Sequence, residues 1–179
     1  GGRQVNDFEV TIRDASAQAA MDQLYARATD LRPALLEIGE DLTGMVKASF
    51  STSTSPWGDR WAPNAQATIM AHLAKFGGSY SKKTGRITAT GSRRVTNKKP
   101  LIGETRALST TIYSRVEGNT LTVGSPMQYA ALQNFGGQAG RGKKVTIPER
   151  RFMPADDTGT LAPGAQDAVL EVLDRYLSK

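Results

Sequence analysis

The sequence predicts an α+β fold in which a small antiparallel sheet packs against two long N-terminal helices and a C-terminal helix. A helical apolar stripe near the start, a hairpin pattern near the middle and a second helical stripe at the end support this class. With 179 residues, 39% of them hydrophobic and 22% charged, residues 1–179 suit a single domain with a core of its own. Residues 77–100 are expected to extend from this domain as a long basic loop or β-arm.

The N-terminal part predicts one strand followed by two helices. Residues 6–12 alternate between apolar and polar side chains, as in a half-buried strand. An apolar stripe then runs from Ala17 to Met45 at helical spacing, with Ala28 among its members. Pro33 interrupts the stripe and Asp30 can cap the helix that resumes, so we expect two helices, or one kinked helix, with a shared buried seam. The stripe is short and lacks systematic flanking charge pairs, which favours packing on the chain's own sheet over a coiled-coil dimer.

Two tryptophans follow the point where the second helix is expected to end, at Phe50. Trp57 and Trp61 stand in a polar segment that leads to Pro63. They suit either a ligand platform or the core, and we favour a core position for Trp61 because large aromatic side chains are mostly buried. Residues 65–75 predict a short helix.

The second half of the chain predicts a hairpin and a short helix. Residues 110–116 and 120–123 flank Gly118-Asn119, a dipeptide typical of tight turns between two strands. Residues 129–135 are typical of a short helix, and Gly136-Gly137 suits a left-handed cap at its end.

The C-terminal part predicts a loop, a strand and a last helix. A second basic, glycine-rich loop covers residues 138–144 and leads into a short strand over residues 145–147. Pro163 is placed to open the last helix, because proline fits the first helical position. Its apolar face comprises Val169, Val172, Leu173, Tyr176 and Leu177.

The net charge of +6 is unevenly distributed along the chain. Acidic residues dominate the N-terminal part, whereas the stretch between Lys75 and Pro100 contains many Lys and Arg and no acid. Long irregular segments in compact domains are usually functional or disordered, and residues 86–90 have the composition of a strand. This segment is therefore the best candidate for a working surface.

Three roles are open for the basic residues: contact with DNA phosphates, solvation, and docking on an acidic neighbour such as the helical face of an adjacent identical subunit. The charge asymmetry favours docking, because head-to-tail rings bring unlike surfaces together. Few aromatic residues lie nearby, so a platform for stacking bases is poorly supported. The candidate contact residues in the two basic segments are Lys82, Lys83, Arg86, Arg93, Arg94, Lys98, Lys99, Arg141, Lys143 and Lys144.

No catalytic or metal-binding constellation stands out, so we expect no enzymatic activity, no metal and no cofactor. His72 is the only histidine and there is no cysteine, which leaves few groups for a nucleophilic relay and excludes thiolate chemistry. The glycine-rich stretch after Gly136 lacks the Gly-Lys-Ser/Thr ending of a phosphate loop. A hydrolase stays open as a class, although the sequence marks no residues for it.

Neither a membrane span nor a secretory leader is expected. No apolar run reaches the length that a bilayer requires. The chain starts at Gly1-Gly2 without an apolar segment behind it, which is expected of a processed or trimmed end.

Four short motifs occur in order in the second half of the chain: Leu101-Ile-Gly-Glu-Thr-Arg-Ala-Leu, Val123-Gly-Ser-Pro, Tyr129-Ala-Ala-Leu-Gln-Asn-Phe-Gly-Gly and Arg150-Arg-Phe-Met-Pro. Together with a Trp-x-Pro segment they resemble the phage virion morphogenesis family, the Mu-like tail-completion proteins. The chain departs from the family pattern at Arg106, where Gly is usual, at Gln133, where His is common, and at Met153-Pro154, where the order differs. The motif residues are Trp61, Pro63, Leu101, Thr105, Leu108, Gly124, Tyr129, Ala130, Phe135, Gly136, Gly137, Arg151 and Phe152.

This resemblance, which covers roughly residues 31–152, implies a structural protein of the head–tail junction rather than an enzyme. It implies a head-to-tail homo-oligomer, a hexameric ring, through which DNA passes. The implied partners are portal or head-completion proteins on one side and tail terminator or tail tube proteins on the other. The implied location is the virion, with the host cytoplasm during assembly. The alternative is a sequence-independent nucleic-acid-binding protein that uses residues 75–100.

Overall fold

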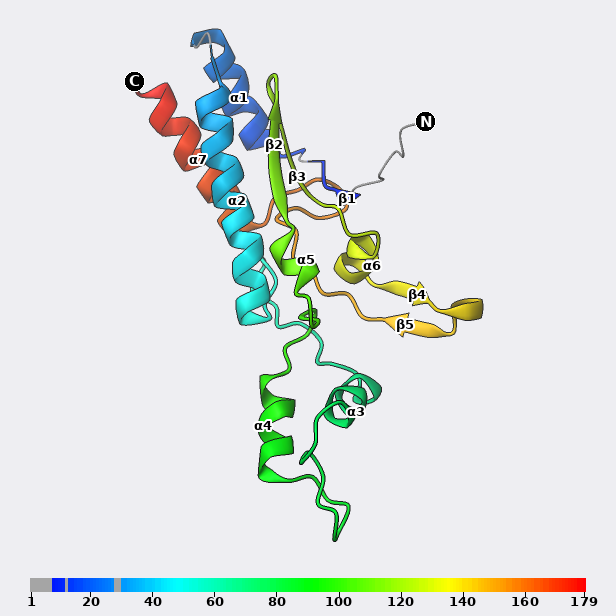
Figure 1. Cartoon of the computed structure of the whole chain (residues 1–179). Helices are drawn as coiled ribbons and strands as arrows, with labels where there is room; N and C mark the ends of the chain where they lie inside the picture. Colours follow the sequence, from blue (N-terminus) through cyan, green and yellow to red (C-terminus); the bar gives the residue numbers. More distant parts are fainter. Residues whose placement is uncertain (1–7, 12, 28–29) are drawn as a thin grey trace, which may run out of the picture.

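The computed structural model describes residues 8–11, 13–27 and 30–179. Helices α1 (Ala15–Arg27), α2 (Arg32–Thr52) and α7 (Pro163–Leu177) pack together, and α2 lies against a three-stranded antiparallel sheet (Figure 1). The sheet has the order β1-β3-β2, with β1 at Phe8–Glu9, β2 at Tyr113–Glu117 and β3 at Thr120–Ser125. The predicted α+β class is therefore confirmed.

The predicted pair of N-terminal helices is also confirmed. Pro33 lies in the first turn of α2, where its missing N–H costs no helical hydrogen bond. The carboxylate of Asp30 accepts a 2.9 Å hydrogen bond from the Arg32 N–H, one of the donors that the start of a helix leaves unpaired. Ala28, a predicted member of the stripe, lies outside the described residues. The buried seam of α2 contains Ala34, Leu35, Ile38, Leu42, Val46 and Phe50.

Helix α2 approaches the sheet closely because Gly39 has no side chain. A Cβ at this position would lie 2.9 Å from Ser114 Oγ on β2 and 3.0 Å from Leu121 Cδ1 on β3. The helix runs to Thr52 rather than ending at Phe50, and it stops where Ser53 turns into the left-handed region with φ 55°. The predicted helix end was thus two residues short.

The strand predicted for residues 6–12 is shorter than expected. Only Phe8 and Glu9 pair with β3, opposite Ser125 and Gly124. Residues 6, 7 and 12 lie outside the described residues. The chain then leaves the sheet, and the Arg13 N–H donates to the carbonyl oxygen of Gly159 at 2.7 Å.

An aromatic cluster fills the core where α2 ends. The rings of Phe50 and Trp61 meet edge to face at 5.4 Å, and Phe152 lies 5.1 Å from Phe50 on the other side. The indole N–H of Trp61 donates to the carbonyl oxygen of Arg151 at 2.8 Å, so its polar atom is paired as well. The prediction that Trp61 fills the core is confirmed.

Residues 77–100 differ from the predicted loop or β-arm. Helix α3 (Gln66–Ala74) forms as expected, but residues 89–97 form a second helix, α4 (Ala89–Asn97). Thr88 caps α4, since its hydroxyl accepts a 3.0 Å hydrogen bond from the Gly91 N–H. The strand expected at residues 86–90 is therefore wrong, and only a single bridge between Tyr80 and Ile87 has strand geometry there.

The central hairpin is confirmed, with Glu117 opposite Thr120 across the Gly118-Asn119 turn. Its first strand starts later than predicted, because residues before Tyr113 form the short helix α5 (Ala107–Thr110) and a turn. A short helix follows β3 as expected, α6 (Ala130–Phe135). Gly136 ends it with φ 73° and ψ −179°, so it does not form the predicted left-handed cap and instead directs the chain into a strand.

The second basic loop is a small hairpin. Strand β4 (Gly137–Ala139) pairs with β5 (Val145–Ile147), and a single turn, η1 (Arg141–Lys143), joins them. The strand at residues 145–147 is confirmed, whereas residues 138 and 139 belong to a strand rather than to the predicted loop. Helix α7 starts at Pro163 as expected. In the part of the chain that the structure describes, no helix combines the length and hydrophobicity needed to span a membrane.

Candidate interaction surfaces

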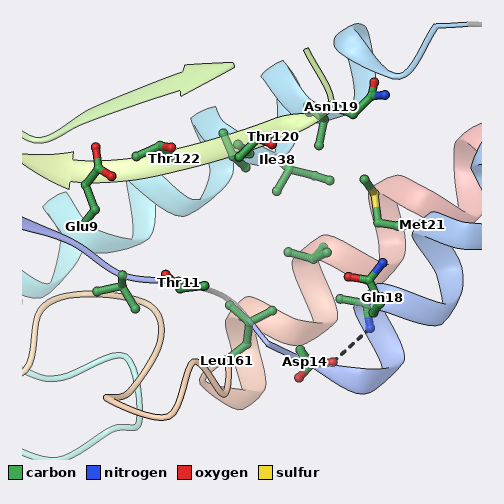
Figure 2. A pocket seen from close by; sticks show the side chains of 15 residues that line it. Glu9, Thr11, Asp14, Gln18, Met21, Ile38, Asn119, Thr120, Thr122 and Leu161 are labelled. Carbon is green, nitrogen blue, oxygen red and sulfur yellow. Dashed lines mark hydrogen bonds between the residues drawn. The ribbon is translucent and has the colours of Figure 1, made fainter. Parts of the chain in front are cut away.

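One groove of the body lies between the sheet and the helices. It encloses about 390 Å³ between the Thr120 end of β3, the start of α1 and Leu161 (Figure 2). Asp14, the buried acid on its wall, already accepts hydrogen bonds from the Ala17 N–H at 3.0 Å and the Gln166 amide at 2.8 Å. This carboxylate therefore caps α1 and joins it to α7.

Metal and acid–base chemistry find no support among the described residues either. No group of three or more His, Asp or Glu side chains comes close enough there to hold a metal ion. The ring of His72 on α3 meets Phe76 edge to face at 5.2 Å. The surfaces that remain for function are two projections from the body.

The first projection is a lobe formed by residues 66–97, that is α3, α4 and the loop between them (Figure 1). Leu73 is buried inside this lobe but does not belong to the main core of the body. Gly91 lets α4 pack on the loop, because a Cβ there would lie 2.3 Å from the carbonyl oxygen of Ser79. The lobe therefore has a small interior of its own and joins the body through few contacts.

Polar contacts fix the base of the lobe. The Asn64 side-chain amide donates to the carbonyl oxygen of Lys98 at 2.9 Å, and the Lys99 ammonium donates to the carbonyl oxygen of Ser51 at 2.6 Å. Lys75 pairs with Glu104, and this contact lowers the pKa of the Glu104 carboxyl group. Lys98 donates to the carbonyl oxygen of Ile102.

The structure divides the predicted contact residues of the lobe into two groups. Arg94 lies inside, where its guanidinium donates to the Gly77 carbonyl at 2.9 Å and to the Ser79 hydroxyl at 2.8 Å. Together with Lys98 and Lys99 it holds the lobe in place. The exposed cations without a side-chain hydrogen bond or ion pair to the described residues are Lys82, Lys83, Arg86 and Arg93.

The tip of the lobe, residues 80–87, combines three of these cations with exposed apolar side chains. Tyr80 is 42% exposed and Ile87 is 46% exposed. The loop is held by backbone hydrogen bonds, from Ser81 N–H to Arg86 O and from Gly85 N–H to Ser81 O, each 2.8 Å long. The tip thus presents a preorganised surface that mixes charge with apolar area.

The second projection is the β4–β5 hairpin, which extends away from the helices (Figure 1). Its turn carries Arg141, Lys143 and Lys144, all exposed. Val145 on β5 is 52% exposed, and a two-stranded hairpin alone is marginally stable in water. A groove of about 520 Å³ separates this hairpin from the base of the lobe.

The motif residues lie elsewhere, in the body and at the base of both projections. Trp61, Leu108, Ala130 and Phe152 are buried in the core, and Phe135 meets Phe8 edge to face at 5.6 Å. Arg151 lies over the ring of Trp57 at 5.4 Å and pairs with Glu149. Tyr129 and Thr105 are exposed, and Leu101 is half-buried with φ 61°.

Two motif glycines are required by close contacts. A Cβ at Gly124 would lie 2.8 Å from the hydroxyl oxygen of Tyr113, its partner across the hairpin. A Cβ at Gly136 would lie 2.8 Å from the Glu149 backbone nitrogen. Gly137, with φ 145°, follows Gly136 at the start of β4, and Pro63 contributes its carbonyl oxygen to the junction described next.

Sequence analysis missed two buried polar residues that join the motifs. Asn134 is 1% exposed, and its side-chain oxygen accepts hydrogen bonds from the backbone N–H groups of Phe152 at 2.9 Å and Met153 at 3.0 Å. Arg150 is buried too, and it donates to the carbonyl oxygens of Ala62 at 2.8 Å and Pro63 at 2.7 Å. Burial lowers the pKa of the Arg150 guanidinium. Both residues lie inside the motifs, but polarity alone does not distinguish them from their polar neighbours Gln133 and Arg151.

Comparison with known proteins agrees with this arrangement of motifs. The model of the phage virion morphogenesis family matches residues 12–178. The Mu-like prophage FluMu G protein 2 of Haemophilus influenzae is 39% identical over 77 residues, which cover 43% of this chain and 51% of that protein. The chain thus matches about half the length of this curated relative. No solved structure matches the chain significantly. Because the family match includes both projections and the body that carries them, the protein belongs to the phage virion morphogenesis family.

Proposed function

We propose that this phage virion protein is a structural connector of the head–tail junction that assembles head to tail into a ring around the path of the DNA. One observation carries the proposal: the body has a complete core, yet the lobe and the hairpin project from it with exposed apolar and basic side chains. Exposed apolar groups on a projection are typical of surfaces that other proteins cover.

In this role the body forms the wall of the ring, and the projections contact neighbours above, below or beside it. Portal or head-completion proteins would bind on one side and tail terminator or tail tube proteins on the other. A hexameric ring fits the resemblance on which this proposal draws. The protein would assemble in the host cytoplasm and remain in the virion.

A second role, sequence-independent binding of nucleic acid through residues 75–100, has weaker support. Arg94, Lys98 and Lys99 are used in contacts inside the protein, which leaves fewer cations to neutralise phosphates. The exposed Tyr80 and Ile87 beside the remaining cations fit a protein surface better than a duplex backbone.

Deletion of the gene from the phage or prophage that encodes the chain tests the proposal. Without the protein, particles should accumulate as separate heads and tails in electron micrographs, and a copy supplied in trans should restore joined virions. Mass measurement of purified virions should detect the protein at a fixed number of copies. Normal virions from the deletion strain, or virions that lack the protein, would refute the proposal.

Assembly of the purified chain gives a second test. Light scattering should show a single oligomeric mass, and electron microscopy of that fraction should show closed rings. A nucleic-acid binder would instead stay monomeric and lose its affinity for duplex DNA steeply as salt is added.

A further inference from the structure

Helices α2 and α7 together carry an acidic surface. Several of its carboxylates form no ion pair with another described residue. Glu37 of α2 pairs with Arg175 of α7 at 2.5 Å, and Met45 of α2 lies beside Gly164 at the other end of α7. The residues between these two contacts, Asp41 on α2 and Glu171 on α7, therefore lie at the same level of the helix pair. All members of this acidic face are exposed: Glu40, Asp41, Asp167 and Glu171.

The acidic face also contains an exposed apolar side chain. Leu36 is 46% exposed and precedes Glu40 by one helical turn, so both lie on the same side of α2. Arg175 of α7 is already paired with Glu37, and this pair raises the pKa of the Arg175 guanidinium, with a smaller contribution from Glu171. The face thus combines carboxylates with an exposed apolar side chain.

We propose that the tip of the lobe, residues 80–87, docks on the acidic face of a second copy of this chain. The two surfaces are complementary: the tip combines Lys82, Lys83 and Arg86 with exposed apolar groups, and the face combines carboxylates with the exposed Leu36. Mixed surfaces with an apolar centre and a charged rim are the usual composition of protein interfaces. This inference rests on the proposed head-to-tail assembly and names the two surfaces that meet in it.

One chain cannot make this contact with itself. Figure 1 shows the tip at the far end of the lobe, while α2 and α7 pack together at the opposite end of the molecule. The backbone hydrogen bonds within residues 81–86 hold the tip in one conformation. Binding therefore costs little conformational entropy at the tip. The tip and the face therefore belong to a contact between copies.

Charge reversal in the full-length chain tests the contact. A tip variant carries Lys82→Glu, Lys83→Glu and Arg86→Glu, and a face variant carries Glu40→Lys, Asp41→Lys and Glu171→Lys. Each alone should weaken self-association, measured by sedimentation, by at least about tenfold in the dissociation constant, because like charges then face each other. A 1:1 mixture of the two variants should associate again, since each tip then meets a face of opposite charge.

A matched control changes the same charge elsewhere. Arg13→Glu, Arg60→Glu and Arg106→Glu, at three exposed cations outside the tip, the acidic face and the hairpin, alter the net charge by the same amount as the tip variant. We expect this control to associate like the wild type. Association of the unmodified chain should also weaken with added salt, because exposed charges are screened.

Cysteine cross-linking locates the contact independently of charge. The chain contains no cysteine, so any disulfide between copies must come from introduced residues. A chain with Lys83→Cys and Glu40→Cys should form linked oligomers under mild oxidation, whereas Lys144→Cys with Glu40→Cys should not.

The inference is wrong if the tip variant associates as strongly as the wild type, or if the mixed variants fail to recover. It is also wrong if the wild type stays monomeric up to about 1 mM, where even weak contacts form. Duplex DNA binding that the tip variant abolishes, without self-association, would assign the tip to nucleic acid instead. The virion role would survive these outcomes, because the gene deletion tests it separately.

Discussion

Replacement of Asn134 by Ala should destabilise the body strongly. The Asn134 side-chain oxygen is the acceptor for two buried backbone N–H groups, those of Phe152 and Met153. A buried donor that loses its partner costs about 1–3 kcal/mol, so the two together cost about 2–6 kcal/mol. Alanine returns roughly 0.5 kcal/mol through its higher helix propensity in α6. The expected loss of unfolding free energy is about 1.5–5.5 kcal/mol.

Urea unfolding followed by tryptophan fluorescence measures this loss. Trp61 suits the purpose because its indole N–H bonds the carbonyl oxygen of Arg151, next to the affected amides. Gln133→Ala is the matched control: it removes an amide side chain from the preceding position of α6 and breaks no side-chain hydrogen bond seen in the structure. The control should change stability by less than about 0.5 kcal/mol. A loss below about 1 kcal/mol for Asn134→Ala would refute the reasoning, since the two amides would then have other acceptors.

Three further changes have distinct expected outcomes. Arg106→Gly should stabilise the protein by about 0.5–1 kcal/mol in urea unfolding, because Arg106 has φ 52° and ψ 22°, a conformation that favours glycine; Arg106→Ala keeps the strain and should give no gain. Gly91→Ala places a methyl group against the Ser79 carbonyl oxygen, so limited proteolysis should cut the lobe faster while the unfolding midpoint of the body stays unchanged. The hydrogen bond from the Thr158 hydroxyl lowers the pKa of the Asp156 carboxyl group below 3.8. The ionised Asp156 therefore stabilises the folded protein above pH 3.8, and this contribution is lost as the pH falls through the lower pKa of the folded state. Asp156→Asn should remove this part of the acid sensitivity in unfolding scans.

Helical periodicity and turn chemistry were sufficient to predict the body. Local geometry alone determines three of these features, whatever the rest of the fold: the helical stripe from Ala17 to Met45, the Gly118-Asn119 turn and the helix start at Pro163. The same logic failed for residues 86–90, where β-branched residues suggested a strand. Thr88 caps α4, a local contact that the strand-like composition hid. Gly91 and Arg94 also fit against Ser79 in the preceding loop, and these contacts join residues further apart in the chain.

The candidate surfaces were only partly predictable for the same reason. Composition identified the basic segments correctly, but it did not distinguish Arg94, which lies inside the lobe, from Arg93, which faces solvent. Adjacent residues on a helix differ in direction by about 100°, so only the packing of α4 on α3 separates the two. The family pattern did contain one structural signal: Gly is usual where Arg106 stands, and the structure has left-handed backbone there.

The Trp-x-Pro segment and the motifs that start at Tyr129 and Arg150 converge on one junction, where their polar side chains bond to backbone groups. Trp61 bonds the backbone at Arg151, Asn134 bonds the backbone of Phe152, and Arg150 bonds the carbonyl oxygens of Ala62 and Pro63. The lobe begins just after Pro63, and the hairpin lies between α6 and Arg150. Because a buried guanidinium must keep its acceptors, the chain leaves the body in one direction at each of these points. The motif positions therefore set the orientation of both projections.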